Sequence, residues 1–482
     1  MSSPSAEPHP DTTLEEVERV VEAAVMASVA VGRTDDSTRA VWLRAIADRL
    51  DAHAEELIEA ADAETALGRP RLPGELARTT AQLRLFAGVI EEGSYLEATI
   101  DHPDAAATPP IPDLRRVLRP IGPVAVFAAS NFPFAFSVAG GDTASALAVG
   151  CPVIVKAHPG HPRTSALTSG HVSAALSAAG APEGAFAMIS GFDAGLALVD
   201  HPGIRAVAFT GSVPGGRALH DRIAQRDAPI PFYGELGSLN PVVITAGADA
   251  QRGAELAAGL AGSFQLGVGQ FCTKPGIVFL PPGSAVERAL PGLLRSQPRM
   301  LTPTIAAGFS SGLQRLSDTP GVRLIGGADD GPAFAVVDAQ TLVDRADELT
   351  EEVFGPFTLL VHVADDAQLQ AALRVLPGSL TATVHHEPQE AVHELVGTLE
   401  QLAGRVLFGG WPTGVAVSWA QHHGGPWPST NTQFTSVGAT AVRRFQRPVA
   451  YQDAPEQLLP PALREENPLG IPRRVDGVLQ LP

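Results

Sequence analysis

The sequence predicts an α/β protein with two parallel-sheet domains in tandem. From Gly122 onward, short runs of β-branched residues alternate with alanine-rich segments of helical length, a pattern typical of βαβ units on a parallel sheet. With 482 residues, the chain is also too long for one compact core, which favours two or three domains.

The segment before Gly122 predicts helices followed by a loop. Between Glu15 and Ala63 the apolar residues recur at helical spacing, which predicts two helices, and a third is expected from Glu75 to Glu91. The proline-rich stretch from Asp101 to Pro112 is expected to form a loop.

Two successive sets of strands and helices follow. In the first set, strands are expected at 124–127, 153–155, 186–189 and 204–209, and helices at 139–149, 164–179 and 215–223. In the second set, strands at 242–244 and 276–280 flank a helix at 251–266. After Gly424 the chain is rich in proline and glycine, which suits an arm that lies on another surface.

Composition excludes several classes of protein. The formal net charge of −18 argues against nucleic acid as a partner, because a phosphate backbone needs a basic face. No run of about eighteen apolar residues is present, so no membrane span is expected. The polar segment Met1–Thr13 lacks the pattern of a signal peptide, which predicts a cytoplasmic protein. Two cysteines are too few for a disulfide scaffold or a cysteine zinc site, and no metal is expected.

The rarest residues are candidates for chemistry. The chain has two lysines, Lys156 and Lys274, among 34 basic residues, and arginine cannot replace lysine where a slim, flexible ammonium is needed. Of the two cysteines, Cys151 lies in a segment typical of a small core residue. Cys272 lies in a predicted loop close to Lys274, where a thiol can act as a nucleophile.

Further candidates follow predicted strands, because ligands of an open α/β sheet bind at the carboxyl ends of its strands. Asn131 offers an amide donor to a developing negative charge, although Asn is also common in turns. Lys156 can donate to ribose hydroxyls or a phosphate. Gly211 and Ser212 open a helix, so their N–H groups can approach a phosphate. Glu235 has apolar, glycine-flanked surroundings, which suit either a general base with a raised pKa or a structural ion pair.

Two other motifs are weaker. Gly308–Gly312 matches the G-x-S-x-G elbow of hydrolases, but no convincing strand precedes it. The segment His385–His393 suggests metal ligands, but Pro388 prevents the single helix that an H-E-x-x-H site requires. The G-x-G-x-x-G fingerprint and the P-loop are both absent.

Taken together, these motifs resemble the aldehyde dehydrogenase superfamily from about Thr13 to Gly477. The order and spacing of six motifs carry the resemblance: Ser130-Asn-Phe-Pro-Phe134, Val155-Lys156, Phe209-Thr-Gly-Ser212, Glu235-Leu-Gly237, Gly269-Gln-Phe-Cys272 and Glu351-Glu-Val-Phe-Gly-Pro356. The resemblance implies a Rossmann-like dinucleotide-binding domain at 1–107 and 124–233 and a catalytic domain at 234–425. It also implies an oligomerisation hairpin at 108–123 and a C-terminal arm at 426–482, through which the family builds dimers or dimers of dimers.

The resemblance also implies roles for individual residues. Cys272 is expected to be the nucleophile and Glu235 the base that activates water, with the Asn131 amide and the Cys272 N–H as the oxyanion hole. Lys156 is expected to hold the adenine-side ribose and Glu352 the nicotinamide ribose. The other residues expected at the cofactor are Ser130, His158, Arg163, Gly211, Ser212, Gly216, Leu236 and Phe354. Such a site would oxidise an aldehyde to a carboxylic acid through a cysteine thiohemiacetal and thioester, with NAD or NADP accepting the hydride.

One departure from the family pattern predicts a preference for NADP. Many NAD-using members place a glutamate three residues after the ribose lysine, and this chain has Pro159 there. Without that carboxylate, and with His158, His161 and Arg163 nearby, there is room for a 2′-phosphate. We therefore expect NADP to be preferred and NAD to be tolerated.

Within the superfamily the chain is most similar to the 2,5-dioxopentanoate (α-ketoglutaric semialdehyde) and NADP-dependent dehydrogenases. The segments that carry this similarity are Gly74–Phe86, Ala135–Ala146, His158–Pro162, His423–Pro426 and Arg443–Pro448.

An acidic semialdehyde needs an arginine for its carboxylate. Arg78 and Arg84 are the candidates, although either can be an ordinary surface residue. The substrate channel is expected to be apolar, which keeps a medium-chain, long-chain or aromatic aldehyde open as the substrate. Its expected lining is Phe134, Val138, Phe271 and the segment from Trp411 to Val415.

Other interpretations remain open. In a CoA-acylating dehydrogenase CoA replaces water, but Glu235 argues for the hydrolytic route. A cofactor-independent hydrolase using Cys272 or Ser310 would need a positioned histidine; none is near in sequence, although a distant one can fold close. A non-catalytic scaffold is disfavoured because every catalytic residue type is present. The sequence leaves open whether Lys274 tunes Cys272 and what Tyr451–Pro482 does.

Overall fold

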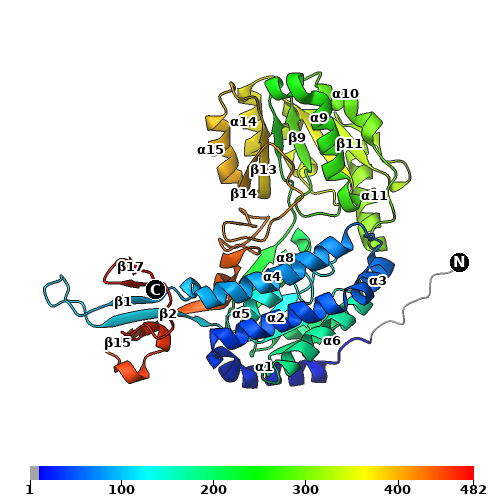
Figure 1. Cartoon of the computed structure of the whole chain (residues 1–482). Coiled ribbons are helices and arrows are strands. Elements are labelled where there is room, and N and C mark those ends of the chain that lie inside the picture. The colour runs from blue at the N-terminus through cyan, green and yellow to red at the C-terminus, as the bar shows by residue number, and fades with distance from the viewer. Residues whose placement is uncertain (1–9) are drawn as a thin grey trace.

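The computed structural model describes residues 10–482 and contains three β-sheets (Figure 1). Two of them are the parallel sheets of α/β lobes, which confirms the predicted fold class, and the third forms an arm that projects from the body. Residues 1–9, which make up most of the polar segment Met1–Thr13, fall outside the described residues. Within residues 10–482, no helix is both long and apolar enough to cross a membrane.

The first sheet is parallel and has the strand order β5-β4-β3-β6-β7. Its strands are β3 (Val124–Phe127), β4 (Val153–Lys156), β5 (Phe186–Ile189), β6 (Ala206–Thr210) and β7 (Phe232–Glu235). Four of these lie where the sequence predicts them. The edge strand β7 was not predicted, because its short run includes a glycine and follows two prolines.

Helices cover both faces of this sheet, as a parallel sheet requires. One face packs on α1 (Leu14–Arg33), α7 (Phe192–Asp200) and α8 (Val213–Ala224). The other face packs on α2 (Asp36–Ala52), α3 (Ala54–Thr65), α4 (Leu72–Glu92), α5 (Gly141–Ala148) and α6 (Pro162–Ala178).

The prediction of two helices between Glu15 and Ala63 was wrong, because three are present. The side chain of Asp35 accepts a hydrogen bond from Thr38 N at 2.8 Å and so caps a new helix. A second break occurs at His53, whose φ of −115° is not helical. Apolar periodicity continues across both breaks, so it does not reveal them.

The second sheet has the order β10-β11-β12-β9-β8-β13-β14 and is parallel except for β10. Its strands are β8 (Val242–Ile244), β9 (Ile277–Leu280), β10 (Arg323–Gly326), β11 (Ala333–Asp338), β12 (Phe357–His362), β13 (Ser379–His385) and β14 (Ala403–Phe408). Its helices are α9 (Ala246–Phe264), α10 (Ala285–Ala289), α11 (Pro303–Asp318), α12 (Ala339–Asp344), α13 (Ala346–Leu349), α14 (Asp366–Arg374) and α15 (His393–Leu402).

The two weaker motifs have structural roles in this lobe. Gly308–Gly312 lies inside α11, which excludes a hydrolase elbow because that elbow joins a strand to a helix. His385 ends β13 and His393 begins α15, so the histidine-rich segment belongs to two separate elements.

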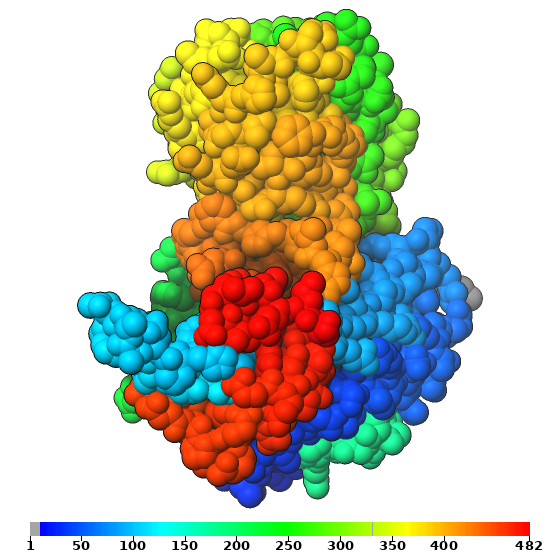
Figure 2. Space-filling view, turned by 60° about the vertical axis from the view of Figure 1, so that its left-hand side comes forward, coloured from blue at the N-terminus to red at the C-terminus, as the bar shows by residue number. Residues whose placement is uncertain are grey.

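The third sheet forms the arm and has the order β15-β2-β1-β16-β17. Its strands are β1 (Thr99–Asp101), β2 (Leu114–Pro120), β15 (Gln446–Gln452), β16 (Arg473–Val475) and β17 (Val478–Gln480). The hairpin therefore begins at Thr99 and not at the predicted residue 108, since the proline-rich stretch is its loop, closed by a bridge between Asp104 and Ile111. The C-terminal segment of unknown role supplies β16 and β17, and Figure 2 shows it beside the hairpin on one face.

Candidate active site

The carboxyl edge of the first sheet carries four of the predicted site residues. Lys156 ends β4 and Glu235 ends β7, while Asn131 follows β3 and Gly211 follows β6. Because these strands are parallel neighbours, their carboxyl ends lie at one edge of the sheet. The second lobe brings Cys272 to the same edge, where its side chain meets that of Glu235.

Cys272 lies in a tight loop between α9 and β9. The three residues 267–269, before it, are left-handed, with φ of 56°, 59° and 64°. The middle one is Val268, and such a backbone at a β-branched residue stores roughly 1–3 kcal/mol of strain. At Gly269 a Cβ would come within 2.2 Å of Gly355 O, so only glycine lets this loop pack on the loop that carries Glu352.

Asn240, which was not predicted, fixes the backbone of the cysteine loop. It is fully buried and left-handed, with φ of 50°. Its Nδ2 donates to Cys272 O at 2.8 Å and to Lys274 O at 2.9 Å. The position of the thiol is therefore set from the start of β8 as well as from its own loop.

The hydrogen bonds of Lys274 are made to the loop of residues 352–357 and not to the Cys272 thiol. Its Nζ donates to Val353 O at 3.1 Å and to Phe357 O at 2.9 Å, and its electrostatic partner is Glu352. Burial lowers the pKa of Lys274 and raises that of Glu352. Lys274 thus holds the loop of residues 352–357, which carries Glu352.

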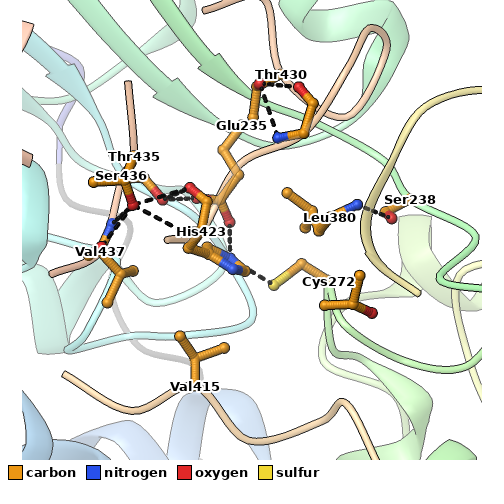
Figure 3. Close-up of polar contacts among 12 residues, drawn as sticks. Glu235, Ser238, Cys272, Leu380, Val415, His423, Thr430, Thr435, Ser436 and Val437 are labelled. Carbon is orange, nitrogen blue, oxygen red and sulfur yellow. Dashed lines mark hydrogen bonds and ion pairs between the residues drawn. The ribbon is translucent and has the colours of Figure 1, made fainter. Parts of the chain in front are cut away.

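His423 joins the nucleophile to the carboxylate (Figure 3). It lies in the segment that returns from the second sheet to the first, and 1% of its side chain is exposed. Its Nε2 is 3.7 Å from Cys272 Sγ and 2.9 Å from Glu235 Oε1. Ser436 Oγ donates to the other oxygen of Glu235, and Thr435 Oγ1 accepts from His423 N at 2.8 Å. The three reacting side chains lie within 4.8 Å of one another.

The hydrogen-bond network assigns the tautomer of His423. An ionised carboxylate only accepts hydrogen bonds, so Nε2 must carry the hydrogen that reaches Glu235. The same N–H lies near Cys272 Sγ, and Nδ1 is buried without a partner in the part of the chain that the structure describes. His423 in this state is a donor to both Glu235 and a thiolate. It is not the base of a cysteine hydrolase, although a distant histidine has indeed folded close.

The pKa shifts agree with Glu235 as an acceptor and Cys272 as a protonated thiol. Burial and the carboxylates of Glu235 and Glu352 raise the pKa of Cys272 well above its ordinary value, against the opposing charge of Arg78. The thiol is therefore protonated at rest. Burial also raises the pKa of Glu235, but His423 and Ser436 outweigh it and leave that pKa below its ordinary value. Of the two alternatives for Glu235, the structure favours the paired carboxylate, because His423 and Ser436 hold its two oxygens.

Asn131 lies against the cysteine loop. Its side-chain Nδ2 donates to Gln270 O at 3.0 Å, two residues before Cys272, and its backbone carbonyl oxygen accepts from Arg71. An amide nitrogen carries two hydrogens, so one remains for an oxyanion formed at Cys272. This arrangement is compatible with the expected oxyanion hole.

The predicted residues for the adenine side of the cofactor differ in charge. Lys156 is half-buried at the end of β4, where burial lowers the pKa of its ammonium and the charge of Asp11 opposes that shift. Ser130 is half-buried next to Asn131. Burial, His161 and Lys156 lower the pKa of His158 to about 3, so this ring is neutral. Arg163 is exposed in the first turn of α6. Of the residues expected near a 2′-phosphate, it is the one that carries a permanent positive charge.

His161, also expected near that phosphate, is a structural residue. It is fully buried, with Nε2 2.9 Å from Ala129 O and Nδ1 3.0 Å from Ser165 Oγ.

The predicted phosphate-side residues lie at the start of α8. Ser212 caps this helix, and Gly211 before it is exposed. A Cβ at Gly216 would come within 2.2 Å of Leu236 Cδ2, so these two residues form one close contact between α8 and β7. Such an exposed helix start offers N–H groups and a positive dipole to a phosphate.

Glu352 and Phe354 lie on the opposite side of the site. A Cβ at Gly237 would come within 2.4 Å of Glu352 Oε2, which places this carboxylate against the backbone that follows Glu235. Phe354 is half-buried in the same loop.

The predicted channel needs correction. Phe134 and Val138 are 1% and 0% exposed in the core of the first lobe, so neither offers surface to a channel. Trp411 packs on Gly259 of α9 and on the ring of His385. Two neighbouring aromatic residues, Phe132 and Phe136, lie at the site instead. The ring centroids of Phe132 and Phe271 are 5.2 Å apart, and those of Phe136 and His423 are 6.2 Å apart.

Comparisons with known proteins agree with this geometry. The model of the aldehyde dehydrogenase family matches residues 6–293. A protein of Azospirillum brasilense named alpha-ketoglutaric semialdehyde dehydrogenase 2 is 47% identical over 96% of this chain and 91% of its own. An alpha-ketoglutaric semialdehyde dehydrogenase of Acinetobacter baylyi is 41% identical over 97% of this chain and 92% of its own.

Solved structures share the fold. PnpE, solved in complex with nicotinamide adenine dinucleotide, has a TM-score of 0.76 at 21% identity, over 94% of this chain and 92% of its own. Aldehyde dehydrogenase 21 of Physcomitrella patens has a TM-score of 0.76 at 20% identity, over 92% and 91% of the two chains. With the cysteine, carboxylate and amide at one sheet edge and the match to the family model, this chain belongs to the aldehyde dehydrogenase family.

Proposed function

We propose that this NAD(P)-dependent enzyme oxidises an acidic semialdehyde, 2,5-dioxopentanoate, and prefers NADP. The two relatives that are 47% and 41% identical carry the name of this activity. The observation that carries the proposal is the charge around the thiol: Arg71, Arg78 and Arg405 all interact electrostatically with Cys272. Guanidinium groups beside the nucleophile favour an anionic aldehyde over a fatty or aromatic one.

The side chains of the site prepare the nucleophile. The Glu235 carboxylate accepts the thiol proton, and His423 Nε2–H donates to the thiolate that forms. Attack on the aldehyde carbon gives a thiohemiacetal, whose oxyanion accepts from the Asn131 amide and the Cys272 N–H. Glu235 releases the thiol proton to solvent before the second half of the reaction. Once the thioester has formed, the Glu235 carboxylate accepts a proton from the attacking water and returns it to the departing sulfur, which releases the carboxylic acid and restores the thiol.

The residues at the sheet edge fit a nicotinamide dinucleotide. The half-buried ammonium of Lys156 lies at the end of β4, with Asp11 as an electrostatic partner, and the start of α8 is exposed. We assign Lys156 and Glu352 to the two riboses and Gly211 and Ser212 to the pyrophosphate. When bound, the dinucleotide supplies the hydride acceptor. Since Pro159 replaces an acidic residue and His158 is neutral, Arg163 is the residue to which we assign the 2′-phosphate.

The substrate and the cofactor can be tested together. NADPH or NADH formation is measured by absorbance with 2,5-dioxopentanoate, pentanal, a long-chain aldehyde and benzaldehyde. We expect kcat/KM to be highest for 2,5-dioxopentanoate, by about 10-fold or more, the value of one charge-assisted hydrogen bond. Equal or better kcat/KM with NAD would overturn the NADP preference. Equal kcat/KM for pentanal and 2,5-dioxopentanoate would overturn the substrate.

Replacing His423 tests its role as a donor. His423→Leu is expected to lower kcat/KM about 10- to 100-fold at pH 7, the value of a hydrogen bond to a charged group. It should also raise the pKa of Cys272 further, which the rate of iodoacetamide alkylation against pH reports. His423→Gln keeps an N–H donor and should restore part of the loss. If Gln and Leu behave alike, the hydrogen bond is not the cause.

Assembly as a homodimer or homotetramer through the arm stays a prediction, as does the cytoplasmic location. Val478 and Leu479 of the outer strand β17 are 64% and 58% exposed. Exposed apolar residues on a sheet edge are typical of a contact surface.

A further inference from the structure

Arg78 occupies an unusual environment on α4. Its Nε donates to Val415 O at 3.4 Å, and its guanidinium lies over the ring of Phe136, 5.3 Å from the centroid. Within residues 10–482 neither terminal nitrogen has a hydrogen-bonding partner, and Nη1 is buried. Desolvated terminal nitrogens of a guanidinium are unfavourable when they have no acceptor, unless a ligand supplies one.

The neighbouring arginines have partners for at least one terminal nitrogen, although Arg71 Nη1 is also buried without a hydrogen-bonding partner within residues 10–482. Arg71 donates to Asn131 O, has Glu75 at 3.5 Å and lies between two aromatic rings. The terminal nitrogens of Arg405 donate to Gly414 O at 2.9 Å and to Pro412 O at 2.6 Å. Only Arg78 among these three has both terminal nitrogens free for a ligand.

Two carboxylates act electrostatically on Arg78, those of Glu75 and Glu235. Glu75 is the acidic residue shared by Arg71 and Arg78, and it interacts with both. Glu75 Oε1 is occupied by the N–H groups of Phe134 and Ala135 at 2.9 and 3.1 Å. Neither carboxylate hydrogen-bonds a terminal nitrogen of Arg78 within residues 10–482, so a bound anionic group would be the first direct acceptor for these nitrogens.

Arg78 is also close to the reacting atoms. The ring of Phe136 lies under its guanidinium and 6.2 Å from the ring of His423, whose Nε2 is 3.7 Å from Cys272 Sγ. Val415, whose carbonyl oxygen accepts from Arg78, is drawn in the same close-up as Cys272 and His423 (Figure 3). A short, charged aldehyde can therefore place its carbonyl at the thiol and its other end at Arg78.

We infer that Arg78 is the specificity-determining residue of this site and binds the carboxylate of a short aldehyde acid through its two terminal nitrogens. This inference rests on the proposed function and adds the residue that selects the substrate. The carboxylate replaces the missing acceptor, and Phe136 supports the guanidinium from its face. An uncharged aldehyde of equal length leaves the guanidinium unpaired, which lowers its kcat/KM.

Arg84 provides a matched control on the same helix. It is exposed and already paired with Asp48 and Asp51 at 2.6 and 2.8 Å. Of the two arginines that the sequence offers for the substrate carboxylate, Arg84 is therefore excluded. Arg78→Gln, Arg78→Lys and Arg84→Gln are compared with the wild type on 2,5-dioxopentanoate and pentanal, with Tm as a test of folding.

For Arg78→Gln we expect KM for 2,5-dioxopentanoate to rise about 30-fold or more, since a charge-assisted bidentate pair is lost, while KM for pentanal changes less than about threefold. Arg78→Lys should lie between, because an ammonium keeps the charge and loses the fork. Arg84→Gln should match the wild type. An unchanged KM for 2,5-dioxopentanoate in a folded Arg78→Gln would overturn the inference.

Binding of the dicarboxylate product separates this inference from the proposed function. Calorimetry with 2-oxopentanedioate requires no turnover. Binding to the wild type that weakens about 30-fold in Arg78→Gln supports the anion site even if 2,5-dioxopentanoate is not the preferred substrate. Equal binding to both proteins, or no binding to the wild type, overturns the inference. A wild type that prefers pentanal overturns only the substrate assigned above.

Discussion

Cys272→Ala is expected to abolish aldehyde-dependent reduction of NADP and NAD, with kcat at least about 10⁴-fold lower, since removal of a covalent nucleophile has effects of this size. No other thiol can replace it. Cys151 is fully buried, its Sγ donates to Phe445 O at 3.3 Å, and burial raises its pKa to about 11. Cys151→Ala is therefore the matched control and should retain activity. Activity above about 1% in Cys272→Ala would contradict covalent catalysis by this residue.

The raised pKa of Cys272 gives this prediction a pH dependence. A thiol whose pKa lies above its ordinary value is mostly protonated at pH 7, and only the thiolate reacts. Alkylation of Cys272 by iodoacetamide, followed by mass spectrometry in the Cys151→Ala background, should therefore speed up about tenfold per pH unit between pH 7 and 9. A rate that is already flat at pH 7 would mean that the thiol is ionised at rest.

Glu235→Gln is expected to lower steady-state kcat about 10²- to 10⁴-fold, the usual contribution of a general base. The glutamine oxygen can still accept from His423 while its amide nitrogen donates to the hydroxyl oxygen of Ser436, so the site should keep its shape. At pH 7 both thiol deprotonation and thioester hydrolysis slow down. At alkaline pH the thiol ionises unaided, and a burst of one NADPH per active site should precede slow turnover.

The burst distinguishes the two roles of Glu235. It is measured by stopped-flow absorbance at pH 7 and pH 9, with wild type as control. Because the pKa of Glu235 lies below its ordinary value, this base stays ionised down to acid pH in the wild type. Linear kinetics without a burst at pH 9 would contradict a deacylation role, and near-normal kcat would contradict any role as base.

Several features of the site could be predicted because they are local in the sequence. Lys156 ends a short apolar strand, while Gly211 and Asn131 come soon after such strands, so the strand ends set their positions. The cysteine loop is equally local, with glycines before the thiol. The predicted channel lining also came from a short segment, but it named Phe134, which is buried in the core, and not Phe136, which lies beside His423. A short motif does not say which of its apolar residues points into the core and which points to the site.

The errors in helix number and in the arm have a common origin. Periodicity reports which face of a segment is buried, and it continues across a cap such as that at Asp35. Pairing of β1 with β16 joins segments at opposite ends of the chain, and no local pattern records such a partner.

The sequence by itself determined the α/β class, the family and the residues that end the strands, because these depend on local periodicity and on motifs of a few residues. Only the tertiary structure decided which distant side chains complete the site. His423 lies 151 residues from Cys272 and 188 from Glu235 in the chain, and Arg78 meets Val415 across 337. Such contacts depend on how the two lobes close on each other, and their energies come from burial and pairing in that one arrangement, which short-range sequence patterns do not encode.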